Sequence, residues 1–383
     1  MTKKICVVTG TRAEYGLLKP LLELISKNKS FTLHIVVCGA HLSPDFGNTF
    51  KEIEDDGFPI DFKVAHLNSD NSPAGVTKST GRALEGFAEA YSIFSPDVVV
   101  LLGDRYEIFA AAAAAHLMRI PIAHIHGGEV TTGALDDGLR HAITKLSTLH
   151  FTACEIYRNR VVQMGEMAEN VYNTGALGID LIRKTELMAQ TELLRELDVD
   201  ESGEFYLVTI HPETAGVETL IADEILQALE NVDKYIVFTG SNADAGGIII
   251  NKKIEDFVKK KSAKRRFFMN LGSLRYLSSL KFASVVIGNS SSGIIEAPFF
   301  KVSVINVGTR QNGRVKSEAV IDCDASVESV QNSIKIAETP EFKAKLDKIV
   351  YPFGDGFASL KIIEVLENID LSKIKTKVFY DMR

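Results

Sequence analysis

The apolar residues of this chain gather in short runs rich in Val and Ile, and each run is followed by a segment of helix length. In the first half these runs lie at 5–8, 33–38, 97–102, 120–125 and, more weakly, 149–153. Runs such as VVVLL lack the polar alternation of a half-exposed strand, which indicates strands covered on both faces. The pattern predicts parallel strands joined by crossover helices.

A second series of apolar runs indicates that the architecture is repeated. These runs lie at 205–210, 235–238, 266–269, 285–287, 302–307 and 319–321. A polar helical stretch at 184–196 separates the two series, and 383 residues exceed what a single core usually accommodates. We therefore predict an α/β protein with two domains, the first over 1–180 and the second over 181–365.

The composition is that of an ordinary globular protein, with 45% hydrophobic and 24% charged residues. A net charge of -7 argues against a nucleic-acid partner, which would require a basic face. The N-terminus enters a strand pattern without a signal sequence, and no apolar run approaches the ~20 residues of a membrane span. We expect a cytoplasmic protein without a membrane partner. The four cysteines lack the paired spacings of a zinc site or a redox dithiol.

Unusual residues follow the predicted strands at their carboxyl ends. The strings are TGTRAEYG at 9–16, GDRYE at 103–107, HIHGGE at 124–129, HPE at 211–213, TGSN at 239–242, GNSSSG at 288–293 and GTR at 308–310. In open parallel sheets, ligands bind beyond these ends, where loops lead into helix N-termini. Two such sets facing across a cleft would make one site.

The Ser-rich turn of the second half is a candidate phosphate site. The hydroxyls and amides of Ser290 and Ser291 precede a short helix, so they could hold a phosphate or simply cap that helix. Pro298 would interrupt the helix after little more than a turn. Glu296 is placed to accept hydrogen bonds from ribose hydroxyls, or else to interact with the helix dipole.

Two arginines and a histidine also stand at strand ends. Arg12 and Arg310 each follow a Gly-Thr pair, where a guanidinium could hold phosphate oxygens bidentately. Either arginine could equally form a surface ion pair. His211 could contact phosphate or sugar, or be a structural histidine.

Three aspartates are candidates for acid–base chemistry. Asp104 ends the most apolar strand, where an unpaired carboxylate would be costly unless it faced a cleft or a partner such as Arg105. Asp136 and Asp137 begin a predicted helix over 134–149. Their i,i+4 partners are Arg140 and His141, which indicates either surface ion pairs or carboxylates positioned for proton transfer.

Two histidines alternate onto one face of the strand that ends near residue 125. Together with Glu129, His124 and His126 could imitate a metal site. No third ligand with an established spacing follows, so we predict proton transfer or hydrogen bonding and no bound metal.

Several of these strings together resemble the hydrolysing UDP-N-acetylglucosamine 2-epimerases of sialic acid synthesis. The strings are TGTRAEYGLLKPLL, GDRYE, HIHGGEVTTGALDDGLRHAITKLS, GNSSSGIIEAP and GTRQNGR, and they occur in the family's order. The resemblance implies a glycosyltransferase-B-like fold, with two Rossmann-like domains whose parallel sheets face each other across a cleft. It also implies that the C-terminal helix 366–383 packs back on the first domain, and that the chain forms a homodimer or homotetramer.

The resemblance assigns roles to the residues singled out above. UDP is held mainly by the second domain, and the nucleotide or phosphate contacts are Arg12, His211, Asn242, Ser290, Ser291, Glu296 and Arg310. The carboxylates near the sugar are Asp104, Glu129, Asp136 and Asp137. His126 departs from the pattern, because animal and non-hydrolysing relatives have a glutamate there. Either Glu129 supplies the missing carboxylate or His126 takes the role itself.

The implied reaction is an anti elimination of UDP, followed by addition of water, and it releases N-acetylmannosamine and UDP without a metal or redox cofactor. A 2,4-diacetamido-trideoxy sugar of legionaminic-type synthesis is an alternative substrate. A retaining glycosyltransferase of the same fold is a rival function, although the clustered carboxylates favour epimerase chemistry. A non-catalytic sugar-nucleotide sensor is another rival, and it would need the phosphate site but not the four carboxylates.

Overall fold

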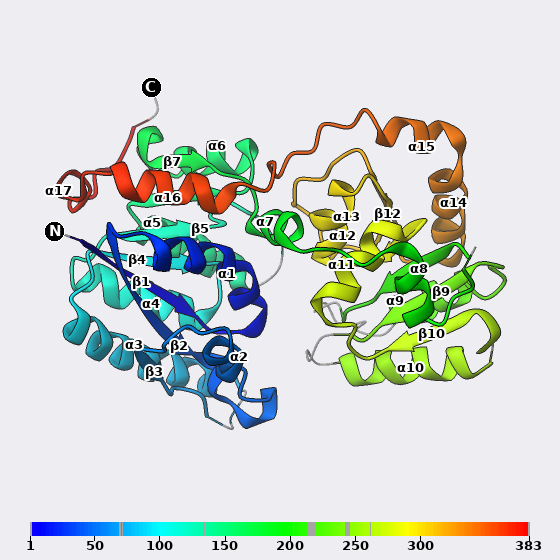
Figure 1. Cartoon of the computed structure of the whole chain (residues 1–383), viewed down its shortest axis with the longest axis horizontal. Helices are drawn as coiled ribbons and strands as arrows, with labels where there is room; N and C mark the ends of the chain where they lie inside the picture. Colours follow the sequence, from blue (N-terminus) through cyan, green and yellow to red (C-terminus); the bar gives the residue numbers. More distant parts are fainter. Residues whose placement is uncertain are drawn as a thin grey trace. The chain divides into compact units, whose positions relative to one another are not determined.

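The protein is described by a computed structural model over residues 2–68, 70, 72–132, 135–201, 203–212, 220–241, 246–260 and 262–381. The chain divides into two compact units. Unit 1 comprises Met1–Leu181 and Phe353–Arg383, and unit 2 comprises Ile182–Pro352 (Figure 1). The sequence predicts a return to the first domain at 366, whereas the return begins at Phe353.

Unit 1 alternates strands and helices along the chain. Its strands are β1 (Lys3–Thr9), β2 (Phe31–Cys38), β3 (Phe62–Val64), β4 (Val98–Leu102), β5 (Ile122–Ile125), β6 (Leu149–Thr152) and β7 (Val171–Asn173). Its helices are α1 (Arg12–Lys27), α2 (Phe50–Asp55), α3 (Pro73–Phe94), α4 (Tyr106–Leu117), α5 (Leu135–Leu146), α6 (Glu155–Gln163), α16 (Ala358–Asn368) and α17 (Leu371–Ile374). Helix α7 (Leu177–Lys184) continues across the boundary into unit 2.

The strands of unit 1 form one parallel sheet in the order β3-β2-β1-β4-β5-β6-β7. Strand β1 lies between β2 and β4, so that Ile5 is opposite Leu33 of β2 on one side and Val98 of β4 on the other. The sheet is therefore wound outward from β1 in both directions, which is the Rossmann-like arrangement. The alanine-rich helix α4 packs between α3 and α5, because its small side chains allow close approach.

Two short strands were not predicted from the sequence. Strands β3 and β7 form the two edges of the sheet, and each has three residues. Each includes an exposed polar residue, Lys63 in β3 and Asn173 in β7. Runs this short and mixed carry no clear periodicity, so their strand conformation is set by pairing with β2 and β6.

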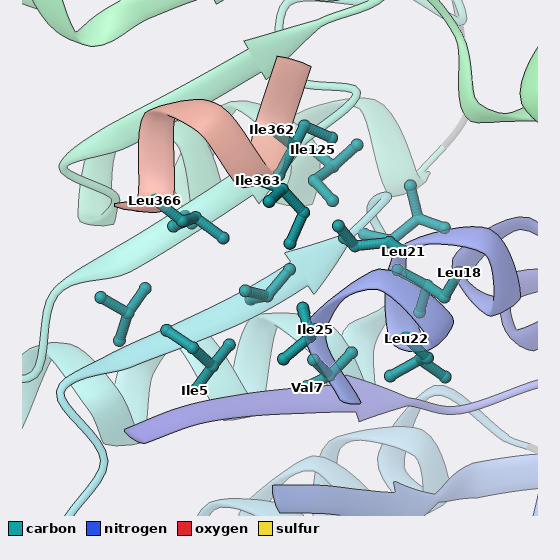
Figure 2. Close-up of a cluster of buried hydrophobic side chains, with 14 of the residues drawn as sticks. Ile5, Val7, Leu18, Leu21, Leu22, Ile25, Ile125, Ile362, Ile363 and Leu366 are labelled. Atoms are coloured by element: carbon teal, nitrogen blue, oxygen red, sulfur yellow. The ribbon is translucent and has the colours of Figure 1, made fainter. Parts of the chain in front are cut away.

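The two ends of the chain share one hydrophobic core. Ile5 and Val7 of β1 pack with Leu18 and Leu22 of α1, and Ile362 of α16 joins the same cluster (Figure 2). Burial of each such side chain contributes roughly 1.5–3 kcal/mol. Unit 1 therefore requires the C-terminal segment for its core.

Asp180 fixes the start of that C-terminal helix. Its two carboxylate oxygens accept hydrogen bonds from the backbone amides of Ala358 and Ser359, at 2.8 and 2.6 Å. The backbone amide of Ala176 also donates to the carbonyl of Phe353 at 2.9 Å. These bonds explain why the return begins at Phe353, before the last helix.

Unit 2 repeats the alternation. Its strands are β8 (Phe205–Thr209), β9 (Tyr235–Thr239), β10 (Arg265–Phe268), β11 (Val285–Gly288), β12 (Ser303–Val307) and β13 (Val320–Cys323). Its helices are α8 (Gln190–Glu196), α9 (Leu220–Ala228), α10 (Gly247–Lys260), α11 (Gly272–Phe282), α12 (Ser291–Ile294), α13 (Glu296–Phe299), α14 (Val327–Glu338) and α15 (Pro340–Leu346). No helix within the described ranges has both the length and the apolar character needed to span a membrane.

The sheet of unit 2 is also wound from its centre. Its parallel strands run in the order β10-β9-β8-β11-β12-β13. Strand β8 therefore occupies the place that β1 has in unit 1. A separate buried cluster that includes Val208, Phe238 and Ile287 forms the core of this unit. The two series of apolar runs in the sequence thus correspond to two separate sheets.

A buried ion cluster attaches the C-terminal tail to unit 1. The carboxylate of Glu166 accepts hydrogen bonds from Lys145 at 2.6 Å and His150 at 3.1 Å, and it pairs with Lys377 of the tail at 2.7 Å. Lys377 also donates to the carbonyl of Ser147, just after α5, at 2.5 Å. Burial by itself raises the pKa of Glu166, but the hydrogen bonds from His150, Lys145 and Lys377 outweigh it and lower the pKa to about 2.

We predict that Glu166→Gln lowers the free energy of unfolding by about 1–3 kcal/mol at pH 7, because it leaves the partly buried Lys145 and Lys377 without a charged acceptor. The pKa of Glu166 in the folded protein is about 2, below its ordinary 4.5. The stabilisation is therefore complete above about pH 4.5 and is lost as pH falls toward 2. Urea unfolding at pH 7 and pH 3 measures this, and the difference between wild type and variant should shrink at pH 3. The exposed Glu364→Gln is the matched control, and equal stability of both variants at pH 7 would contradict the prediction.

Candidate functional site

Each unit has one point where the strand order reverses. It lies between β1 and β4 in unit 1 and between β8 and β11 in unit 2. Connections leave these neighbouring strands toward opposite faces of the sheet, so their carboxyl ends border the usual ligand position of such folds. The predicted site residues follow these strands or the adjacent β5, β9 and β12.

The acidic residues of unit 1 are organised by the buried side chain of Arg140. This residue of α5 is 3% exposed. Its guanidinium forms ion pairs with Asp104, at the end of β4, and with Asp137 at 3.3 Å. A buried guanidinium is stable only beside compensating charge. The pairing therefore brings the end of β4 and the start of α5 together.

The structure corrects two pairings expected from the sequence. The sequence offers Arg105 as one possible partner of Asp104, but Arg105 pairs with Glu107 at 2.5 Å, and Asp104 pairs with Arg140. Arg140 pairs with Asp137 at i,i+3 rather than with Asp136 at i,i+4. The reason is that Arg140 is buried rather than on the helix surface, so its partners are set by tertiary packing and not by helical spacing.

Asp136 has the environment of a proton carrier. The side chain is partly buried at the start of α5. Burial raises the pKa of its carboxyl group, and the negative charge of Asp104 raises it further. Two carboxylates with different environments, one paired with a guanidinium and one inclined to hold a proton, are typical of acid–base sites.

His124 is a positioning residue for this group. Its buried ring donates from Nε2 to the carbonyl of Gly103 at 2.8 Å and lies 3.1 Å from the hydroxyl of Thr144 through Nδ1. Burial lowers the pKa of His124 to about 3, so the ring is neutral. It links the turn before Asp104 to helix α5.

His126 and Glu129 form an imidazole–carboxylate pair. The backbone of His126 has φ 66°, a conformation uncommon outside glycine and often found at functional sites. Its Nδ1 lies 3.3 Å from Oε1 of Glu129, which is 5% exposed. Its Nε2 accepts a hydrogen bond from the backbone amide of Leu177 at 3.4 Å. This assignment puts the ring proton on Nδ1, facing the carboxylate.

The histidines do not form a metal site with Glu129. His124 and His126 have separate partners, the first toward α5 and the second toward Leu177. Across the part of the chain that is described, no three or more His, Cys, Asp or Glu side chains are grouped so as to hold a metal ion.

Arg12 lies at the expected strand end but has a protein partner. It is the first residue of α1, whose N-cap Thr11 accepts a hydrogen bond from the amide of Glu14 at 3.2 Å. The exposed Arg12 side chain pairs with Glu52 of α2 at 3.0 Å. The surface ion pair considered from the sequence is thus present, and phosphate contact by Arg12 stays a prediction.

The strand ends of unit 2 are held together by one buried amide, Asn289. Its side chain accepts a hydrogen bond from the backbone amide of His211 at 2.8 Å and donates to the carbonyl of His211 at 2.9 Å. The preceding Gly288 has φ 137°, and a Cβ there would lie 1.9 Å from the carbonyl of Thr209, so only glycine fits. The end of β11 is therefore locked against the end of β8.

Asn289 also receives side chains from the loop after β12. Its backbone carbonyl accepts hydrogen bonds from Arg310 at 3.1 Å and from the buried Gln311 at 2.9 Å. The structure thus brings Arg310 to the Ser-rich turn, as a phosphate site requires. Asn289 and Gln311 were not singled out from the sequence. The sequence signal that could have identified Asn289 is an asparagine that directly follows an apolar strand ending in glycine.

The hydroxyls of the Ser-rich turn form a chain. Ser290 is the N-cap residue of α12, and its hydroxyl lies 3.0 Å from that of Ser292. The hydroxyl of Tyr276 in α11 bonds Ser292 in turn. The side chains of Ser290 and Ser292 are therefore fixed by neighbours rather than free to rotate.

The helix after this turn is broken, as Pro298 predicts. Helix α12 ends at Ile294 and α13 begins at Glu296, because the proline ring would clash with the carbonyl of residue 294. The hydroxyl of Tyr351 donates to the carbonyl of Ile295 at 2.7 Å. Burial raises the pKa of Tyr351, and the charge of Glu296 raises it further. Asn242, the remaining predicted contact, lies outside the described residues.

The comparison with known proteins decides the family. The family described as UDP-N-acetylglucosamine 2-epimerase matches residues 23–367. The chain belongs to this family.

Relatives of this epimerase family match over nearly the whole chain. The chain is 40% identical over 385 residues, 99% of both chains, to the GDP/UDP-N,N'-diacetylbacillosamine 2-epimerase (hydrolyzing) of Campylobacter jejuni. It is 38% identical to the polysialic acid biosynthesis protein P7 of Escherichia coli, over 99% of this chain and 98% of that one. The crystal structure of the Neisseria meningitidis UDP-GlcNAc 2-epimerase bound to UDP-GlcNAc superimposes with a TM-score of 0.80 at 21% identity, over 95% and 99% of the two chains.

These matches confirm two predictions made from the sequence. The resemblance to hydrolysing UDP-N-acetylglucosamine 2-epimerases is correct at the level of the family. The predicted fold class of two Rossmann-like domains, as in glycosyltransferase-B-like proteins, is also correct.

We predict that Asn289→Ala weakens UDP binding at least about tenfold and lowers stability by about 1–3 kcal/mol, because the backbone groups of His211 lose their partners. Isothermal titration with UDP and thermal unfolding measure the two effects. Asn332→Ala, on the exposed side of α14, is the matched control. Unchanged UDP affinity in the Asn289 variant would show that the strand-end lock does not serve the nucleotide.

Proposed function

We propose that this epimerase-family protein is a hydrolysing 2-epimerase of a UDP-2-acetamido sugar. Water and the UDP-sugar become UDP and a free 2-acetamido sugar inverted at carbon 2. The observation that carries the proposal is the acid–base group of unit 1, in which Asp104, Asp137 and Arg140 are paired and Asp136 is inclined to hold a proton. A binding protein would have no need for this group of charged side chains around a buried guanidinium.

The chemistry divides into two steps. In the first, a base removes the proton from carbon 2, the bond from carbon 1 to the diphosphate oxygen breaks, and UDP leaves with the bonding electrons. In the second, water adds its hydroxyl to carbon 1, and carbon 2 receives a proton on the opposite face. Positive charge develops on the sugar ring during the bond breaking, and the carboxylate of Asp104 offsets it.

Unit 2 holds the nucleotide in this proposal. The hydroxyls of Ser290 and Ser291 and the guanidinium of Arg310 bind the diphosphate and stabilise the charge that it gains on departure. Glu296 accepts hydrogen bonds from the ribose hydroxyls, and Asn242 and His211 complete the contacts. The locked geometry of Asn289 supports this assignment, since the strand ends need no rearrangement when ligand arrives.

Glu129 is our candidate for the base at carbon 2. The Nε2 lone pair of His126 is occupied by the amide of Leu177, so the ring has no free basic nitrogen in this conformation. Its Nδ1 lies against Glu129 and orients that carboxylate. His126 then substitutes for the family's glutamate as a positioning residue rather than as the base.

The sugar is a 2-acetamido hexose, and the relatives favour two forms of it. The relative of 40% identity is named for N,N'-diacetylbacillosamine, which is a 2,4-diacetamido-2,4,6-trideoxy sugar. The relative of 38% identity is named for polysialic acid biosynthesis, which favours N-acetylglucosamine. We place the diacetamido sugar first, because the name of the first relative states a 2-epimerase activity.

An assay in heavy water without an acceptor tests the activity and the substrate together. Each UDP-sugar is incubated with the protein, and NMR follows the sugar. Released UDP with deuterium at carbon 2 identifies the epimerase, whereas an intact substrate would indicate a sensor or a transferase that waits for an acceptor. The true substrate should have a kcat/KM at least about tenfold above the other, because the two sugars differ in polar groups.

We predict that Asp104→Asn retains UDP affinity and loses turnover by a factor of about 10² to 10⁴, because it removes a charge that matters in the transition state. Titration with UDP and steady-state kinetics measure the two quantities, and circular dichroism checks the fold, since Arg140 loses a partner. The exposed Asp45→Asn is the control. Weakened UDP binding with normal turnover would exclude the proposed role.

We also predict that Glu129→Gln reduces kcat at least about a hundredfold and His126→Gln by about tenfold, because only the first removes the base. Deuterium exchange at carbon 2 is the direct measurement. A larger defect in the His126 variant would reverse the two roles.

A further inference from the structure

A buried carboxylate lies beneath the loop that follows β1. The side chain of Glu107, in the first turn of α4, is 0% exposed. A Cβ on Gly10 would come within 2.9 Å of its Oε1, and a Cβ on Gly39 would come within 3.0 Å of the same atom. The carboxylate is thus enclosed by the backbone of the loops after β1 and β2, and substitution of either glycine would displace it.

Only one oxygen of the Glu107 carboxylate has a hydrogen-bond partner among the described residues. Oε1 accepts a hydrogen bond from Nε of Arg105 at 2.5 Å. Oε2 is buried and has no hydrogen-bond partner among the described residues. A buried carboxylate oxygen without a hydrogen bond raises the free energy of the folded protein, so we expect a donor close to Oε2.

Glu14 supplies a second carboxyl group at the same glycine. Its Oε2 accepts a hydrogen bond from the amide of Gly10 at 2.7 Å. This atom would be 3.3 Å from a Cβ on Gly10, so the carboxyls of Glu14 and Glu107 flank one residue. Burial raises the pKa of Glu14 to about 8, and the charge of Glu107 contributes in the same direction.

The charges around this pair balance only if one carboxyl is neutral. Arg105 is the cation that pairs with Glu107. His41 and His66 pack nearby, but burial lowers the pKa of both, to about 4 for His41, so neither adds positive charge. Burial also raises the pKa of Cys38 and of Tyr106, which keeps both uncharged. Asp104, the remaining neighbour, already pairs with Arg140.

Arg105 is the residue that the carboxyl group of Glu107 holds in place. Arg105 directly follows Asp104 and is the N-cap residue of α4. Its Nε is taken by Glu107, its side chain is 42% exposed, and its terminal nitrogens have no partner among the described residues. The guanidinium is therefore fixed from below while its terminal N–H groups remain available to an anion.

We propose that Glu14 and Glu107 share one proton and act as a positioning pair that fixes Arg105 for the departing diphosphate of the sugar nucleotide. In this pair the carboxylate of Glu107 orients the guanidinium through its Nε, and Glu14 carries the proton. The inference rests on the proposed function for the identity of the anion. The shared proton itself does not depend on that function.

The pair is tested first by a measurement that requires no turnover. NMR of protein labelled with ¹³C at the glutamate carboxyl carbons follows one signal that titrates near pH 8 and is absent from Glu14→Gln. Glu89→Gln, on the exposed face of α3, should leave that signal in place. Titration of Glu14 near pH 4.5 would overturn the shared proton, whether or not the protein is an epimerase.

The positioning role is tested by a double-variant cycle. We predict that Glu107→Gln and Arg105→Met each lower kcat/KM about thirtyfold and weaken UDP binding, and that the double variant is no worse than either. The alkaline fall of the wild-type pH–rate profile, centred near pH 8, should move upward in Glu14→Gln, which stays neutral. Independent, additive effects or an unmoved alkaline limb would overturn the positioning role.

Thermal unfolding first establishes which variants fold. If Glu107→Gln does not fold, Arg105→Lys replaces it in the comparison. The lysine lacks the Nε–H that Glu107 accepts, so it should reproduce the loss in kcat/KM. Full activity in Arg105→Lys would contradict the proposal. A wild-type protein that binds UDP but turns over neither UDP-sugar would instead refute the proposed function and leave the titration result standing.

Discussion

The acid–base group of unit 1 depends on one buried guanidinium, that of Arg140. A buried charge must be compensated where it lies, so the side chain can exist only with carboxylates beside it. Asp104 comes from the end of β4 and Asp137 from the start of α5, and the two segments meet because Arg140 needs both. His124 strengthens the same junction by bonding Gly103 and Thr144. The carboxylates are therefore held in place before any ligand arrives, which lowers the reorganisation that catalysis would require.

In unit 2 the strand ends are joined through a neutral side chain, that of Asn289. The side chain of Asn289 makes two hydrogen bonds with the backbone of His211, and its carbonyl receives Arg310 and Gln311. A neutral amide suits a site for a diphosphate, since a fixed carboxylate there would repel the ligand. The two units thus share a topology and differ in the polarity of their strand ends. This difference in polarity matches the proposed function, in which unit 1 acts on the sugar and unit 2 holds the diphosphate.

In the proposed function, His126 stands where the resemblance implies a glutamate, and Glu129 supplies the carboxylate instead. An imidazole at this place cannot act as base while Leu177 donates to it, but it can donate to Glu129. The carboxylate then moves from one side chain to its neighbour three residues on. The guanidinium of Arg105 is likewise oriented by a neighbour. Its Nε donates to Glu107, while its terminal nitrogens have no partner among the described residues. In both proposals one side chain acts on the substrate, and a neighbouring side chain orients it.

The sequence by itself determined the two-sheet architecture, since hydrophobic burial on both faces of a central strand leaves a continuous apolar run such as VVVLL. It also determined the break before Pro298 and the strand ends at which Asp104, His211 and Ser290 stand. It did not determine β3 and β7, whose few polar-containing residues become strands only by pairing with a neighbour.

Only the tertiary structure decided which charges meet. Helical spacing relates Arg140 to Asp136, yet the buried guanidinium reaches Asp104, which lies 36 positions away in the chain. Adjacency relates Asp104 to Arg105, yet Arg105 turns to Glu107. The return of the chain at Phe353 likewise depends on Asp180, far away in sequence. Hydrophobic periodicity is a local property that any segment reveals, whereas the partner of a buried charge is set by the three-dimensional packing that surrounds it.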